Sequence, residues 1–348
     1  MRFQDIQKVL FIRLRSLGDC VLMTPCLEAL KTRWPHLRLD VLVERPFMAV
    51  YQGNPHVGRL LVLERGRSGL QTAWRRLLTG LRLRREGYQL VLNYHGGSTS
   101  LFLMRLCKSP ERAGYAHYRS PAAYTCLLDG PERYFGGGPM HTVQYQLALL
   151  ARLGLELPDP PPPPSFPVPA EAARTVRSRL AAMGRSGAGF GLVPPTAPLA
   201  PQQWPPVAFA RFIDQVRRET GAPVILSCGP GERPVLEAIG QALEQPAPGF
   251  SDLTLPELGA LIQGAAVFVG CDSGPAHIAA ALKKKVCVVF GSSNHQAWGP
   301  WETEHRLVRL PFGCSPCPGY DCQAYGHPRC IEEIEPAAVY AAFRQLFD

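Results

Sequence analysis

One stretch in the last third of the chain constrains the fold class more than any other. An apolar segment at 267–269 leads through a turn at 270–272 into a short helix at 273–282, and a second apolar segment follows at 286–290. This order predicts a βαβ unit, because two parallel strands need a crossover connection between them. Open α/β sheets bind ligands at the carboxyl ends of their strands. Polar clusters follow both strands here, so the sequence predicts a ligand site at that edge.

The turn after the first of these strands predicts an anion site. Asp272 and Ser273 precede a helix whose first-turn amides lack intrahelical partners, and Gly274 lets a ligand approach the backbone closely. Such a site needs no metal. The alternative is structural: Asp272 or Ser273 caps the helix, and His277 is a hydrogen-bonded polar residue of the interior.

The N-terminus predicts a second strand followed by a helix. Residues 8–14 are an apolar strand, and the spacing of Leu22, Cys26 and Leu30 marks one face of a helix. Asp19 is expected in the turn between them. A carboxylate there is either a helix cap or a general base that takes the proton of an attacking hydroxyl.

A proline-rich segment at 157–169 divides the chain. Proline at this density excludes helix and central strand and predicts a stiff polyproline II spacer. We therefore expect two domains, residues 1–165 and 166–348. The fold class predicted is α/β, with two doubly wound Rossmann-like domains facing one another across a cleft.

The net charge of +9 comes from the first half of the 348 residues. Residues 1–165 hold 22 Lys and Arg against 12 Asp and Glu, a net of +10, whereas residues 166–348 hold 15 against 16, a net of −1. A basic half predicts an anionic partner, such as a phosphorylated glycolipid, a membrane surface or nucleic acid, unless it is only a solvated surface. No nucleic-acid-binding pattern is present, so nucleic acid is not an expected partner.

Residues 68–85 predict a basic amphipathic helix. Its apolar positions share one face, with arginines around them: Leu70, Trp74, Leu77, Leu78 and Leu81, and Arg75, Arg76, Arg82, Arg84 and Arg85. Two interpretations are open. Either the apolar face packs on the domain and the arginines are solvated, or the helix contacts a membrane surface or the acceptor lipid.

Hydropathy and cysteine content bear on location. No apolar run reaches the roughly 20 residues that span a bilayer, and no signal peptide is present, so we expect a cytoplasmic protein, with peripheral attachment to the inner membrane as an option. The eleven cysteines are then thiols or metal ligands. Four of them lie close together and offer a tetrahedral thiolate metal site, reduced structural thiols or an adventitious disulfide: Cys314, Cys317, Cys322 and Cys330.

The strings around these turns resemble a known family. Asp-Ser-Gly-Pro-Ala-His at 272–277, Phe-Gly-Ser-Ser at 290–293, Trp-Gly-Pro-Trp at 298–301 and Arg-x-Arg-Ser-Leu-Gly-Asp at 13–19 are similar to motifs of glycosyltransferase family 9, the ADP-heptose:lipopolysaccharide heptosyltransferases. The resemblance implies the glycosyltransferase-B fold, with the acceptor in the first domain and the nucleotide-sugar in the second. In that fold the last helix, 336–347, is expected to pack back on the first domain. It also implies inverting transfer from ADP-heptose to a lipopolysaccharide core or other glycolipid, with Asp19 as base and without a cofactor or an obligatory metal.

The resemblance assigns binding residues to both substrates. Those expected at the donor are Thr196, Gln202, Glu232, Asp272, Ser273, Gly274 and His277. Those expected at the acceptor are Arg13, Arg15, Ser16, Gly18, His95 and Arg112.

The sequence departs from the family pattern at one donor position. Gln202 stands where the family normally has a Lys that neutralises the pyrophosphate. Losing one preorganised cation beside a leaving diphosphate typically costs a few kcal/mol of transition-state stabilisation. Either Arg13 or Arg15 and the helix N-termini compensate, or activity is low, or the donor differs. A nucleotide-sugar-binding protein with lost or altered catalysis is the rival hypothesis, whereas a nicotinamide dehydrogenase is disfavoured because no Gly-x-Gly-x-x-Gly follows the first strand.

Overall fold

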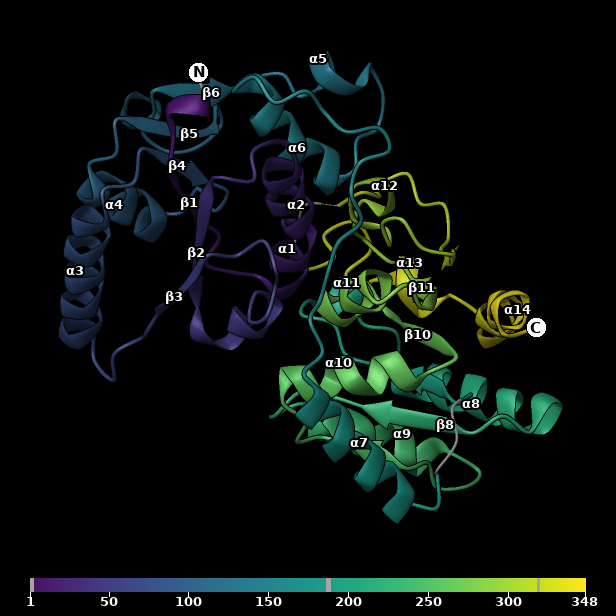
Figure 1. Ribbon diagram of the computed structural model, residues 1–348. Helices are drawn as coiled ribbons and strands as arrows, with labels where there is room; N and C mark the ends of the chain where they lie inside the picture. The colour runs from purple at the N-terminus through teal and green to yellow at the C-terminus, as the bar shows by residue number, and fades with distance from the viewer. Residues whose placement is uncertain (1–2, 186–188, 318–319) are drawn as a thin grey trace. The chain divides into compact units, whose positions relative to one another are not determined.

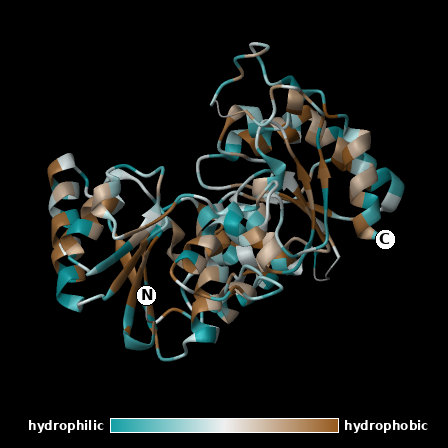
Figure 2. Ribbon diagram, turned by 90° about the horizontal axis from the view of Figure 1, so that it is seen from above, coloured by the Kyte–Doolittle hydropathy of each residue, from teal (hydrophilic) through white to brown (hydrophobic). Residues whose placement is uncertain are grey.

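The computed structural model describes residues 3–185, 189–317 and 320–348, and the chain divides into two compact units, Met1–Pro167 and Val168–Asp348 (Figure 1). Each unit contains one six-stranded parallel sheet. The predicted doubly wound α/β class is therefore confirmed. Many strand residues are brown in Figure 2, as a sheet covered on both faces requires.

The first sheet grows outward in both directions from its first strand. Its strands are β1 Lys8–Ile12, β2 Arg38–Glu44, β3 Arg59–Leu63, β4 Leu90–Asn93, β5 Glu111–Tyr115 and β6 Cys126–Leu128. They lie in the order β3-β2-β1-β4-β5-β6, and Ile12 pairs with Leu42 on one side and Asn93 on the other. The direction of winding reverses between β1 and β4, and such a switch point is where α/β sheets bind ligands.

Helices cover both faces of this sheet. They are α1 Leu17–Leu22, α2 Thr24–Arg33, α3 Gly69–Glu86, α4 Ser98–Cys107, α5 Glu132–Phe135 and α6 Thr142–Arg152, with 3-10 turns η1 Phe3–Asp5, η2 Arg45–Val50 and η3 Pro121–Ala123. Helices α3 and α4 pack together on one face, and α1, α2 and α6 lie on the other (Figure 1). Leu83 of α3 and Leu103 of α4 join Leu10 and Val91 of the sheet in one apolar core.

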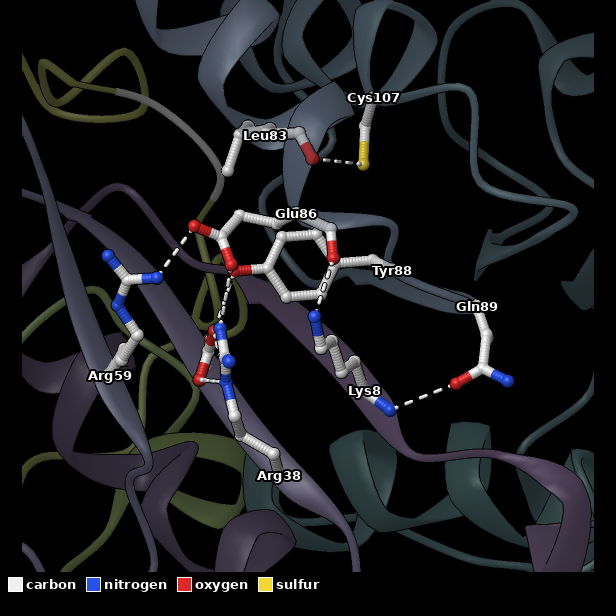
Figure 3. A network of polar contacts seen from close by, with 9 residues as sticks. Lys8, Arg38, Arg59, Leu83, Glu86, Tyr88, Gln89 and Cys107 are labelled. Atoms are coloured by element: carbon white, nitrogen blue, oxygen red, sulfur yellow. Dashed lines mark hydrogen bonds and ion pairs between the residues drawn. The ribbon is translucent and has the colours of Figure 1, made fainter.

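A polar network ties the end of α3 to the sheet (Figure 3). Asp40 of β2 is fully buried and accepts hydrogen bonds from Arg38 Nη2 and from the Tyr88 hydroxyl, both at 2.6 Å. Glu86, the last residue of α3, accepts from Arg38 at 2.9 Å and from Arg59 at 2.6 Å. Burial and the Asp40 carboxylate raise the pKa of Tyr88, so its hydroxyl stays a donor. The network fixes how α3 lies on its unit.

The end of the proline-rich segment lies against the first unit. The Ser165 amide donates to Thr24 Oγ1 at 2.8 Å, and its hydroxyl accepts from Asn54 Nδ2 at 3.1 Å. Phe166 is buried. The proline-rich segment is therefore held against the first unit by Ser165 and Phe166, directly before that unit ends at Pro167.

The second sheet repeats the winding of the first. Its strands are β7 Gly191–Val193, β8 Val224–Ser227, β9 Gly249–Phe250, β10 Val267–Cys271, β11 Lys285–Val289 and β12 His305–Val308, in the order β12-β11-β10-β7-β8-β9. Its switch point lies between β7 and β10. The βαβ unit predicted from the sequence supplies β10 and β11. Strand β10 is two residues longer than predicted, because Gly270 and Cys271 pair with Val288 and Val289.

The helices of the second unit complete its two layers. They are α7 Ala170–Ala182, α8 Pro206–Thr220, α9 Arg233–Ala242, α10 Leu255–Gly264, α11 Gly274–Ala281, α12 His295–Trp298, α13 Arg329–Glu332 and α14 Pro336–Phe347, with the 3-10 turn η4 Ala200–Gln202. No helix in the described parts of the chain combines the length and hydropathy needed to cross a bilayer.

The closing helix α14 belongs to the core of the second unit. It packs against α8, β10, β11 and β12, and Val339, Phe343 and Leu346 are buried in the core that also contains Phe212. The sequence predicts that this helix also packs back on the first domain, and that contact stays a prediction. Within its own unit, the helix lies on the sheet whose strands β10, β11 and β12 precede it in the chain.

Candidate active site

The first-unit site lies where β1 and β4 end, at the switch point of the first sheet. The sequence predicts Asp19 in a turn before the helix. Helix α1 instead begins at Leu17, so Asp19 lies in its first turn. The Asp19 Oδ2 atom accepts from the Ser16 hydroxyl at 2.8 Å and from the Ser16 amide at 3.3 Å. This return bond to the N-cap residue explains why the helix starts early.

Arg13 holds the other carboxylate oxygen of Asp19. Its guanidinium forms an ion pair with Asp19 Oδ1 and donates a hydrogen bond to the Tyr94 carbonyl, which follows β4. The Asp19 side chain is 19% exposed and that of Arg13 is 12% exposed. The carboxylate is therefore oriented on both oxygens yet still reachable from solvent.

His95 lies in the loop after β4, close to the arginines after β1. Burial and the positive charges of Arg13 and Arg15 lower the pKa of His95 to about 4, so the imidazole is neutral at neutral pH. Asn93, the last residue of β4, accepts from the backbone amides of His95 and Gly96 at 3.1 and 3.2 Å. Sequence reasoning missed Asn93, although a buried amide at a strand end is the signal that could have found it.

Aromatic side chains at the carboxyl end of β5 and on α6 also belong to this edge. Tyr115 stacks on Tyr145 with ring centroids 4.7 Å apart, and Tyr118 packs edge-on against Tyr115 at 5.2 Å. Gly96 has φ +72°, and a Cβ there would lie 2.3 Å from the Tyr118 ring, so the loop needs glycine.

Three further residues predicted at the acceptor are placed differently. Arg15 is exposed beside the site, and Gly18 is buried inside α1. Arg112 is the second residue of β5, near its amino end, and donates to the carbonyls of Ala123 at 2.7 Å and Ser109 at 2.5 Å. The structure does not bring Arg112 to the carboxyl edge, and its contact with an acceptor stays a prediction.

The second-unit site lies at the switch point of the second sheet, where Asp272 follows β10. Gln202 Nε2 donates to Asp272 Oδ2 at 3.3 Å and to Ser293 Oγ at 2.8 Å, which joins the loops after β7, β10 and β11. Burial raises the pKa of Asp272 to about 6, and the nearby Ser293 hydroxyl opposes part of this rise. The amide of Gln202 therefore faces a carboxyl group that takes up a proton more readily than an exposed one does.

The N-terminus of α11 carries the residues predicted to bind phosphate. Ser273 is its N-cap, Gly274 its first residue, and His277, one turn later, is buried. Ser273 is only 7% exposed, and among the described residues its hydroxyl oxygen has no hydrogen-bond partner. A buried hydroxyl at a helix N-terminus without a protein partner suits an anionic ligand.

Glu232 is fixed by its own loop and by the loop after the neighbouring strand. Its Oε2 atom accepts from the Gly229 amide at 2.7 Å and from the Thr196 hydroxyl at 2.9 Å. Because β7 and β8 are adjacent, this bond joins two loops of the predicted donor site.

A cavity of about 500 Å³ lies beside Gln202 within the second unit. It is lined by Leu199, Gln202, Ser292, Ser293, Asn294, Trp298, Pro316 and Cys317. No Lys or Arg is among these lining residues. Sequence reasoning missed Asn294 and Trp298 as cavity residues, although Asn294 directly follows the Phe-Gly-Ser-Ser string and Trp298 begins the Trp-Gly-Pro-Trp string.

The four C-terminal cysteines line one smaller cavity of about 250 Å³. Burial, with a contribution from the neighbouring thiols, raises the pKa of Cys330. Within residues 3–185, 189–317 and 320–348, however, no group of three or more His, Cys, Asp or Glu side chains is arranged to hold a metal ion. The sequence left a thiolate metal site open, and the described side chains do not form one.

Known proteins resemble the chain over most of its length. A family model described as glycosyltransferase family 9 (heptosyltransferase) matches residues 75–326. Lipopolysaccharide heptosyltransferase 3 of Escherichia coli K12 is 27% identical over 300 residues, 83% of each chain. The glycosyltransferase family 9 structure from Veillonella parvula DSM 2008 has a TM-score of 0.85 at 17% identity, covering 98% of this chain and 97% of that chain. Escherichia coli heptosyltransferase WaaC with ADP has a TM-score of 0.73 at 18% identity, covering 97% and 99%.

These likenesses bear on fold and family at different strengths. The two solved structures share the architecture of both units, which confirms the predicted glycosyltransferase-B fold. The family model covers well over half of the chain and includes the loops of the second-unit site. The predicted resemblance is thus confirmed, and the chain belongs to glycosyltransferase family 9, the heptosyltransferases.

Proposed function

We propose that the chain is an inverting heptosyltransferase that moves heptose from ADP-heptose to a lipopolysaccharide core. The observation that carries the proposal is the Asp19 carboxylate, oriented by Ser16 and Arg13 at the switch point of the first sheet. The names of the relatives support the substrates: one is a lipopolysaccharide heptosyltransferase, and one heptosyltransferase structure contains ADP.

In the proposed reaction Asp19 is the general base. An acceptor hydroxyl attacks the anomeric carbon of the heptose from the face opposite the diphosphate, and its proton passes to Asp19. The new bond joins the acceptor oxygen to the anomeric carbon. The bond from that carbon to the diphosphate oxygen breaks, and ADP leaves with the electron pair. The configuration at the anomeric carbon is therefore inverted.

The second unit is proposed to hold the donor. The amides at the start of α11 and the Ser273 hydroxyl suit the diphosphate, with His277 one turn behind them. The Glu232 oxygen that faces away from Thr196 suits a ribose hydroxyl, since carboxylate to hydroxyl is a strong hydrogen bond. The acceptor is a glycolipid, so the enzyme is proposed to act at the cytoplasmic surface of the inner membrane.

Calorimetry followed by a transfer assay tests the proposal. The purified chain is titrated with ADP-heptose, ADP, UDP and GDP, and transfer from the donor that binds is then measured with a truncated lipopolysaccharide core. We expect ADP-heptose and ADP to bind, and we expect Asp272→Ala to lower their affinity. Preference for UDP or GDP would show that ADP-heptose is not the donor, and the fold assignment would stand.

Gln202 favours a second candidate. The cavity beside it is lined without Lys or Arg, so diphosphate charge meets no side-chain cation among those lining residues. A family member that binds a nucleotide-sugar with altered or lost catalysis, or that uses a different sugar, would fit this feature. Donor binding without turnover on any heptose acceptor would support that candidate over heptose transfer.

A further inference from the structure

Helix α3 carries an apolar stripe that the first unit does not cover. Leu70, Trp74, Leu78 and Leu81 are exposed by 87%, 60%, 47% and 39%. Their spacing of four, four and three residues puts them on one side of the helix. A helix on the surface of a soluble domain normally turns its apolar side to the core and its polar side to water. Helix α3 has apolar residues on the side that faces water.

The exposure of the stripe follows from how the rest of α3 is packed. Gly80 and Leu83 are buried on its other side, where α3 meets α4. A Cβ on Gly80 would lie 2.4 Å from Leu106 Cδ1, so the two helices approach closely at this point. The polar network at Glu86 fixes the C-terminal end (Figure 3). The stripe therefore cannot turn inward without breaking this packing.

Positive charge without carboxylate partners surrounds the stripe. Arg67, Arg82, Arg84 and Arg85 are exposed, and none of the ion pairs in the described parts of the chain involves them. At about 100° per residue, Arg82 and Arg84 lie on opposite flanks of the apolar stripe. Glu86 is the one acid in the helix sequence, and Arg38 and Arg59 already neutralise it.

An exposed apolar stripe flanked by arginines is the pattern of a helix that lies in a membrane interface. Apolar side chains enter the boundary between headgroups and acyl chains, while the cations meet anionic phosphates. Five arginines in the 18 residues of α3 exclude a spanning role. Figure 1 shows α3 beside α4 over one face of its own sheet, and the same helix in Figure 2 carries both brown and teal residues.

We propose that α3 docks the chain onto an anionic phospholipid bilayer. Leu70, Trp74, Leu78 and Leu81 insert into the interface, and the four exposed arginines bind lipid phosphates. The inference deepens the proposed function, because it rests on the glycolipid acceptor for its biological setting. Its physical basis, the stripe and its charges, is independent of which sugar is transferred.

Vesicle binding of the full chain tests the proposal. Sedimentation is measured with vesicles of phosphatidylcholine alone and with vesicles that also contain phosphatidylglycerol. We expect binding to the anionic vesicles that weakens as salt is added, because salt screens the arginines. Trp74→Ser/Leu78→Ser should lower the partition coefficient at least about tenfold, since two apolar side chains no longer insert. Arg82→Gln/Arg84→Gln/Arg85→Gln should lower it about fivefold for each arginine.

Two controls separate docking from general effects on the surface. Met183→Ser/Val207→Ser removes two exposed apolar side chains from the second unit, which are 40% and 49% exposed, and should bind vesicles like wild type. Insertion of Trp74 should shift the tryptophan emission of wild type to shorter wavelength when vesicles bind. Trp74→Phe keeps an apolar ring at this position but removes its indole, so vesicle binding should persist while the contribution of Trp74 to this shift disappears. All variants change exposed positions, and their thermal unfolding should match wild type.

The outcomes also separate this proposal from heptose transfer. Transfer to a water-soluble core fragment should be unchanged in Trp74→Ser/Leu78→Ser, while transfer to acceptor embedded in anionic vesicles should fall. Wild type that ignores anionic vesicles, or a stripe variant that binds them like wild type, would overturn docking even if transfer works. Self-association of wild type that is lost in the stripe variant, without vesicle binding, would assign the stripe to a second copy of the chain and also overturn docking.

Discussion

The guanidinium of Arg13 forms an ion pair with the carboxylate of Asp19, and the same side chain reaches the Tyr94 carbonyl beyond β4. The two loops at the switch point of the first sheet are thereby joined through one arginine. The carboxylate proposed as base is held from the strand side by Arg13 and from the helix side by Ser16. Its orientation depends on both contacts.

Asp19→Asn should abolish most transfer while donor binding stays unchanged. The amide has nearly the same shape but cannot accept the proton of the acceptor hydroxyl, a contribution of about 10²- to 10⁴-fold for general base catalysis. The measurement is kcat for transfer together with calorimetry of the donor. Asp5→Asn, at an exposed carboxylate in η1, is the matched control and should behave like wild type. An Asp19→Asn protein with wild-type kcat would exclude the base role.

Gln202→Lys should raise the transfer rate. The new ammonium would lie near Asp272 and Ser293 in a cavity lined without Lys or Arg, where it could stabilise charge that develops on the leaving diphosphate. We expect an increase in kcat/KM of about tenfold. Gln202→Met, similar in length but uncharged, controls for shape and should not increase the rate. If both variants fall below wild type, the glutamine has its own function in the donor site.

Asp272→Asn should stabilise the fold in a manner that depends on pH. Burial raises the pKa of this carboxyl from 3.8 to about 6, so the folded state holds a proton that the unfolded state has lost between these values. Wild-type stability should therefore fall as pH rises through this window. The asparagine variant escapes that loss and should be more stable above pH 6 by up to about 3 kcal/mol. Urea unfolding of both proteins below pH 4 and above pH 7 measures it, and an equal difference at both pH values would contradict the assignment.

Thr196→Val should weaken donor binding without unfolding the chain. The variant removes the hydroxyl that donates to Glu232 and leaves that carboxylate with the Gly229 amide alone. A lost hydrogen bond of this kind costs about 1 kcal/mol, roughly a fivefold rise in the Kd of the donor. Thr196→Ser keeps the hydroxyl that donates the hydrogen bond to Glu232, so this variant should bind the nucleotide-sugar like wild type. Equal affinity in both variants would show that the bond between the two loops does not position Glu232 for ligand.

Local sequence patterns were enough to predict the fold class and the approximate positions of the polar turns. Apolar runs and helical spacing are local properties, so the segments around Asp19 and Asp272 predicted strands, turns and helices within a few residues. The start of α1 differed because Asp19 bonds back to Ser16, a contact that strand and helix propensities do not include. The packing of α14 on β10, β11 and β12 could not be read from its apolar spacing, which shows that a helix has a buried side but not what buries it.

Tertiary structure decided the contacts between distant residues. Gln202 meets Asp272, and Thr196 meets Glu232, only because parallel strands bring their carboxyl ends to one edge. Tertiary structure also decided the orientation of α3. The sequence predicted an amphipathic helix, but apolar residues lie on two sides of it, and either side could have faced the unit. Close packing of Gly80 against Leu106 and the ion pairs of Glu86 selected the side that faces the unit, and this left Trp74 in water.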